Sequence, residues 1–162
     1  MPSITYPFQP KSTAKLVPGQ YWGVPLSNGT YACGRVVQVL AKGVEGSRVT
    51  FLAGLMDWNG SEPPNAATIA GADFLGQGQA HLKTITENGG TVLGHRPLET
   101  NNLNPWQFRG AEFFRNSYVY EGLIKARPQT PDDDKLPVLG VWGFKFITTL
   151  AEKEFVRREA AS

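Results

Sequence analysis

The stretch that decides the fold is residues 17–39, which reads V-P-G-Q-Y-W-G-V-P-L-S-N-G-T-Y-A-C-G-R-V-V-Q-V. Two segments rich in aromatic and β-branched residues, 20–26 and 30–40, flank Asn28-Gly29. Asn and Gly tolerate the positive φ angles of a tight turn, so these segments are predicted to pair as an antiparallel hairpin. The stretch offers neither a nucleophile with a base nor a set of metal ligands. Its content therefore favours recognition over chemistry.

Further strands and helices are expected on both sides of this hairpin. Residues 48–55 resume the β-branched pattern after the turn-like cluster Gly43-Val44-Glu45-Gly46, so a third strand completes an N-terminal meander. In the middle of the chain, a short helix is expected after residue 65 and another over residues 79–88, where Gly89-Gly90 ends it. Shorter strands are expected over residues 91–93, 117–126 and the first half of 137–146.

The C-terminal tail changes its hydrophobic period. Ile147, Leu150, Ala151 and Phe155 recur at helical spacing between charged residues, which predicts an amphipathic helix over residues 147–160. The fold class expected is therefore α+β. We expect an antiparallel, strongly bent or barrel-like sheet that begins with the N-terminal meander, one or two short middle helices and a C-terminal amphipathic helix.

Composition indicates one domain of ordinary size. The chain has 162 residues, of which 41% are hydrophobic and 19% are charged. Its 18 glycines and 12 prolines favour many short strands and turns over long helices. We expect a proline-interrupted N-terminal arm over residues 1–16, with Tyr6 and Phe8 as its anchors, and a single globular domain over residues 17–162.

Charge and hydropathy bear on partners and location. The formal net charge of +2 is spread along the chain, which argues against a nucleic-acid or membrane partner held by bulk electrostatics. The N-terminus lacks a continuous apolar signal region, and no stretch reaches the roughly 20 apolar residues that span a bilayer. We therefore expect a cytoplasmic protein. The sequence leaves its oligomeric state open.

Few residues offer chemistry. The single cysteine, Cys33, is expected to be a small buried side chain, because a catalytic thiol needs a neighbouring base and only His81 and His95 are available. The run Asp132-Asp133-Asp134 lies between prolines and indicates an exposed loop. A calcium site there is the alternative, although consecutive aspartates point apart. We predict no metal site and no cofactor.

Enzyme motifs are absent from the sequence. It contains no H-E-x-x-H, G-x-S-x-G, Walker loop or nucleotide-binding G-x-G-x-x-G after a strand. Asp57-Trp58 is the best single candidate for a ligand cleft, since an acid beside an aromatic ring suits a sugar or a base. The alternative is an Asp that starts a turn and a Trp that covers the core. The chain is predicted not to be an enzyme.

The opening hairpin resembles the N-terminal signature of the immunity protein 26 family, which is encoded in bacterial polymorphic-toxin loci. A G-x-W-G-F element at residues 140–144 resembles the ending of that family more loosely. Family members often have Asp at the positions of Gln20 and Asn28, so the motif carries less negative charge in this chain. The motif residues are Pro18-Gly19, Val24-Pro25-Leu26, Gly29, Tyr31-Ala32 and Gly34-Arg35-Val36.

The resemblance implies a non-enzymatic cytoplasmic protein that binds and neutralises a cognate protein toxin. Arg35 is a candidate functional residue because it lies in an otherwise apolar strand. Three roles are open to its side chain: an ion pair with a buried carboxylate, contact with a partner, or a structural position in which its stem extends from a sheet edge. One alternative is a ligand-binding or hydrolytic β-barrel with a cleft near Asp57 and His81 or His95. The other is a nucleic-acid-binding SH3-like barrel. The candidate partner-binding residues are Tyr21, Trp22, Tyr31, Arg35, Asp57 and Trp58.

Overall fold

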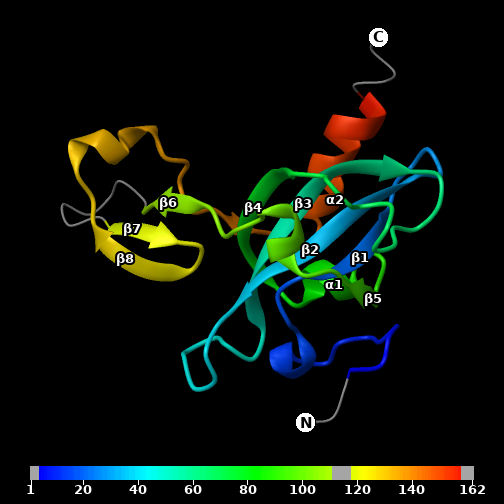
Figure 1. Cartoon of the computed structure of the whole chain (residues 1–162), viewed down its shortest axis with the longest axis horizontal. Coiled ribbons are helices and arrows are strands. Elements are labelled where there is room, and N and C mark those ends of the chain that lie inside the picture. Colours follow the sequence, from blue (N-terminus) through cyan, green and yellow to red (C-terminus); the bar gives the residue numbers. More distant parts are fainter. Residues whose placement is uncertain (1–3, 111–117, 158–162) are drawn as a thin grey trace.

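A computed structural model describes residues 4–110 and 118–157 of the chain. These residues form a mixed α+β fold with a six-stranded sheet in the order β5-β1-β2-β3-β4-β9 (Figure 1). All neighbouring strands of this sheet are antiparallel except β4 and β9. The six strands are β1 (Gln20–Pro25), β2 (Tyr31–Val39), β3 (Thr50–Gly60), β4 (Phe74–His81), β5 (Val92–His95) and β9 (Val141–Trp142).

The predicted meander is present. β1 and β2 pair from Tyr21 opposite Arg35 to Pro25 opposite Tyr31, and β3 follows in antiparallel register. In the turn, the backbone amide of Leu26 donates to the carbonyl of Thr30 at 2.9 Å, and Gly29 has a φ of 84°. The side chain of Asn28 accepts from both the amide and the hydroxyl of Thr30. The Asn-Gly pair therefore shapes this hairpin as expected.

Gly34 gives Trp22 its place in the core. The two residues are opposite in the β1–β2 register, and a Cβ added at Gly34 would lie 2.4 Å from the indole ring. The ring is fully buried and meets Phe51 edge-on, with centroids 6.1 Å apart. The absence of a side chain at Gly34 thus leaves the space that the largest core side chain fills.

Side chains of the main sheet form two buried clusters. The first contains Trp22, Phe51 and Trp142, and Ile147 and Ala151 of helix α2 (Phe146–Glu152) pack into it. Partly buried Tyr6 and Phe8 also pack against this cluster, so the N-terminal arm is anchored as expected. The second cluster contains Tyr21, Cys33, Val37, Leu52, Met56, Ile69, Phe74, Leu98, Leu103 and Phe108.

A second, three-stranded sheet extends to one side of the main sheet (Figure 1). Its strands are β6 (Gln107–Arg109), β7 (Tyr118–Glu121) and β8 (Ile124–Pro128). Two buried or half-buried glutamines join it to the main sheet. The side chain of Gln38 donates to the Glu121 carbonyl and accepts from the Leu123 amide. The side chain of Gln77 donates to the Asn104 carbonyl and accepts from the Trp106 amide.

Three expectations for the middle and the later part of the chain need correction: one strand and two helices. The segment 117–126 is two strands, because the chain turns at Gly122, whose φ is 62°. The helix expected over residues 79–88 is shorter, because residues 79–81 belong to β4 and only α1 (Lys83–Thr86) is helical. The helix expected after residue 65 is absent, and residues 66–71 form turns. The main sheet is open, with β5 and β9 as its two edges, and a strongly bent or barrel-like form of it stays a prediction.

The remaining helical segments are short. The C-terminal helix is present as α2, which continues into a π-helical turn, η4 (Lys153–Arg157). The rest of its expected range, residues 158–160, lies outside the described residues, as does residue 117 of the expected strand. Three short 3-10 helices accompany the strands: η1 (Thr13–Lys15), η2 (Leu98–Asn101) and η3 (Pro131–Lys135).

A Gly34→Ala substitution tests the packing of Trp22. The added methyl would overlap the buried indole ring, so we expect the free energy of unfolding to fall by about 1–3 kcal/mol in urea denaturation. Gly143→Ala is the matched control, because a Cβ there meets no atom within 4 Å. Equal stability of the two variants would contradict this account of the core.

Candidate functional site

The candidate partner-binding residues lie in two different environments. Tyr21, Trp22 and Arg35 are buried, with exposed fractions of 6%, 0% and 0%. Burial raises the pKa of Tyr21, which favours its neutral form in the core. These three side chains are therefore part of the interior of the free protein. In this structure they are not on the surface, and their contact with a partner stays a prediction.

Arg35 binds main-chain carbonyls from two other segments. Its Nη2 donates to Gly19 O at 3.2 Å and to Arg96 O at 2.6 Å. Its Nε and Nη1 are buried with no hydrogen-bond partner among the described residues. Burial lowers the pKa of Arg35. The guanidinium thus has neither the carboxylate partner nor the sheet-edge position considered from the sequence.

Tyr31, Asp57 and Trp58 lie at the end of the sheet that carries the β1–β2 turn. Tyr31 pairs with Gly60 in the sheet. The ring of Trp58 lies against Gly60, so that a Cβ added at Gly60 would be 2.6 Å from the indole. Tyr31 and Trp58 are half-buried, whereas Asp57 is exposed. Because successive strand residues point to opposite faces, Asp57 and Trp58 do not face one site.

The remaining chemical candidates are dispersed. His81 pairs with Thr50 at the start of β3, seven residues before Asp57, so about 23 Å of strand separates them. His95 pairs with Gln20 at the corresponding end of β1. Cys33 is fully buried, which raises its thiol pKa to about 12. The structure therefore does not bring Asp57 together with either histidine, and Cys33 is the buried side chain that we expected.

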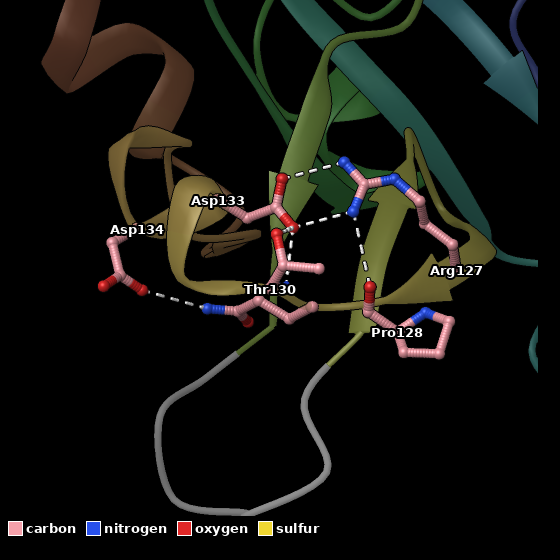
Figure 2. A network of polar contacts seen from close by, with 6 residues as sticks. Arg127, Pro128, Thr130, Asp133 and Asp134 are labelled. Carbon is pink, nitrogen blue, oxygen red and sulfur yellow. Dashed lines mark hydrogen bonds and ion pairs between the residues drawn. The ribbon is translucent and has the colours of Figure 1, made fainter.

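The aspartate run forms a structural cap instead of an exposed loop. Arg127 donates to both carboxylate oxygens of Asp133, at 2.7 and 2.8 Å, and Thr130 donates through its amide and hydroxyl (Figure 2). The Arg127 guanidinium and the Thr130 amide hold the pKa of Asp133 well below its usual range. Asp133 thus caps η3 and ties it to β8, while Asp132 and Asp134 are exposed.

A cavity of about 920 Å³ lies between the N-terminal arm and the loop that joins β2 to β3. Both segments are at the lower end of the molecule in Figure 1, where η1 is blue and the loop is cyan. Ligand sites in proteins have volumes of about 300–1,000 Å³. The lining residues are Ser12, Thr13, Ala14, Leu16, Val39, Leu40, Lys42, Gly43, Val44, Gly46, Ser47 and Arg48.

Hydrogen bonds fix the two walls of this cavity. The hydroxyl of Thr13 donates to the carbonyl of Ser47, and the Thr13 amide donates to Arg48 O at 2.9 Å. Both Thr13 and Ser47 are buried. In the loop, the amides of Val49 and Thr50 donate to the carbonyl of Gly46, whose φ is 79°. The cavity is therefore held in shape by the fold itself.

The cavity combines apolar surface with positive charge. Ala14, Leu16, Val39, Leu40 and Val44 supply apolar side chains, and Val44 is 47% exposed. Lys42 and Arg48 are exposed cations in the lining, which contains no Asp, Glu, His or Cys. These groups suit binding of an anionic, partly apolar ligand by contact and charge.

The sequence indicates the two segments that form this cavity, but not that they meet. It shows the arm and the cluster Gly43-Val44-Glu45-Gly46 as separate features. The distribution of charge was the available signal, because residues 4–56 contain four exposed cations and one acid, Glu45. The two segments are joined by long-range hydrogen bonds from Thr13 to Ser47 and Arg48, which no local pattern encodes.

Comparisons with known proteins give no family for this chain. No family model matches the sequence, and neither the curated proteins nor the solved structures contain a significant match. Within the described residues, no group of three or more His, Cys, Asp or Glu side chains is arranged to hold a metal ion. None of the described helices has both the length and the apolar character needed to cross a membrane.

An Asp133→Asn substitution tests the cap on η3. The depressed pKa means that ionised Asp133 stabilises the fold above its unfolded-state pKa of about 3.9, and this stabilisation is lost as the pH falls below that value. We expect urea denaturation to show a stability loss at pH 7 that shrinks towards pH 2.5. Asp132→Asn is the control; an Asp133→Asn effect of equal size at both pH values would contradict the assignment.

A Thr13→Val substitution tests the wall of the cavity. It keeps the side-chain shape but leaves the buried Ser47 carbonyl without its hydroxyl donor, so we expect a loss of about 1 kcal/mol in unfolding free energy. Hydrogen exchange of amides in residues 12–16 and 44–50 is expected to accelerate. The exposed Thr149→Val is the control, and unchanged exchange in Thr13→Val would argue against the bond.

Proposed function

We propose that this protein is a non-enzymatic, immunity-type protein that binds and neutralises a cognate bacterial toxin in the cytoplasm. The observation that carries the proposal is the hairpin motif from Pro18 to Val36, which resembles the opening of the immunity protein 26 family. A strongly bent form of the main sheet belongs to the same proposal, and the register shifts along β1, β2 and β3 favour it.

The roles of the motif residues support a shared fold more than a shared binding site. Gly34 leaves room for Trp22, Gly19 offers its carbonyl to Arg35, and Gly29 adopts the positive φ of the turn. All three positions require glycine, since Gly19 has a φ of 103° and a Cβ there would lie 2.7 Å from the Arg96 carbonyl, which explains why such a motif accompanies one architecture. A partner must therefore be recognised by residues outside the buried part of the motif.

The cavity beside the N-terminal arm supports a binding role. It presents apolar surface and two exposed cations without an acid–base pair in its lining. A hydrolytic cleft near Asp57 has less support, because His81 and His95 lie at the other end of the strands. A nucleic-acid-binding surface also has less support, since the cavity lining has no aromatic ring on which bases stack.

Co-expression with the protein encoded by the neighbouring gene tests this function. We expect that protein to arrest bacterial growth when it is produced alone, and growth to recover when this chain is produced with it. A purified complex of the two proteins should also form in solution. The proposal fails if the neighbour is harmless, or if cells die equally with and without this chain.

A further inference from the structure

We propose that the cavity between the N-terminal arm and the β2–β3 loop binds an acidic peptide segment that carries an apolar side chain. This inference rests on the proposed function, for which it names the recognition surface: such a segment would belong to the toxin.

The apolar part of the ligand follows from the lining. Buried Leu16 and half-buried Val39 and Leu40 line the cavity, and Val44 in its lining is 47% exposed. Exposed apolar surface in a preformed concavity gains free energy when a partner side chain removes it from water. The volume of about 920 Å³ leaves room for more than one residue of a partner.

The acidic part of the ligand follows from charge complementarity. Lys42 and Arg48 line the cavity, and exposed Lys11 and Lys15 flank the lining residues of the arm in sequence. Glu45 is the only acid among residues 4–56, and it is not part of the lining. Carboxylates of a partner therefore find cations and little competing negative charge at this end of the molecule.

The opposite end of the main sheet has the reverse character. Asp57, Glu62 and Asp73 occur in a stretch, residues 49–82, that contains no Lys or Arg. Asp57 and Asp73 are joined through a backbone hydrogen bond of 2.8 Å, so these acids lie at the end that carries the β1–β2 turn. An acidic ligand is thus repelled from one end of the sheet and attracted to the other.

A peptide is the occupant that fits best among acidic ligands. A nucleic acid is also anionic, but single-stranded nucleic acids are bound through aromatic stacking as well as charge. The cavity lining contains no Phe, Tyr, Trp or His. Leu, Val and Ala instead offer the small apolar contacts that receive an aliphatic or aromatic side chain from a protein partner.

Binding of a labelled peptide to the full chain tests the inference. The probe is a fluorescein-labelled peptide of six Glu and two Leu residues, and the comparison peptide has Lys in place of Glu. We expect anisotropy to report binding of the acidic peptide alone, weakened by added salt. The double variant Lys42→Glu/Arg48→Glu should reduce its affinity about tenfold, because two attractions become repulsions.

Two further variants make the result specific. Lys135→Glu/Lys153→Glu changes the net charge equally with exposed residues of η3 and η4, and we expect wild-type affinity from it. Ala14→Trp places a large ring in the cavity from an exposed position and should abolish binding while thermal unfolding remains wild-type. The inference is overturned if the acidic peptide fails to bind wild-type protein, or binds all variants equally. Tighter cavity binding of a dT12 oligonucleotide would overturn it too.

Co-expression with the neighbouring protein separates this inference from the proposed function. If the neighbouring protein is harmless, the proposed function fails, and the peptide measurement still decides whether the cavity binds an acidic segment. If Lys42→Glu/Arg48→Glu rescues growth as well as wild-type protein does, the inference fails while the immunity function stands. Loss of rescue in this variant, with rescue kept in Lys135→Glu/Lys153→Glu, supports both.

Discussion

The burial of the Arg35 guanidinium is the constraint on which the arrangement of the chain depends. Removing an ion from water costs several kcal/mol unless the protein binds it well. Arg35 meets this cost in part through the carbonyls of Gly19 and Arg96, which lie at the start of β1 and just after β5. The side chain of Arg96 extends the network to Ala66 and Asn101. One buried cation on β2 thereby links the start of β1 and the end of β5, and through Arg96 it is connected to the loops that carry Ala66 and Asn101.

This network explains why the fold and the proposed binding surface use different residues. Gly19, which accepts from Arg35, and Gly34, which makes room for Trp22, are buried and are not available to a partner without unfolding part of the core. The cavity, by contrast, is formed by the arm and the β2–β3 loop, which add to the end of the sheet. If the cavity is the binding surface that we propose, substitutions there change the partner while the core stays the same.

Local patterns predicted the elements that depend on neighbours in sequence. The Asn28-Gly29 hairpin and the first three strands follow from turn chemistry and β-branched runs, and α2 follows from its period. The extended helix over residues 79–88 was wrong because pairing of Gln79 with Leu52 of β3 outweighs a weak helical pattern. The β-branched and aromatic residues around Gly122 predict one strand, but Gly122 has a positive φ and forms the turn of the β7–β8 hairpin.

The candidate site was harder to predict, because it depends on long-range contacts. The sequence indicates aromatic binding groups, but Tyr21 and Trp22 are buried in the core. It also predicts an exposed loop at the aspartates, but Arg127 binds Asp133, which caps η3. The cavity requires the arm to return to the β2–β3 loop, and only the excess of cations in the first 56 residues indicated a site there.

The most direct test of the account is a hydrogen-exchange footprint of the neighbouring gene's product on this chain. The account predicts that binding protects amides in residues 12–16 and 39–48 and leaves exchange in residues 27–30 and 57–62 unchanged. Protection confined to the β1–β2 turn and the end of β3, with the cavity segments unaffected, would contradict the claim that recognition occurs at the cavity.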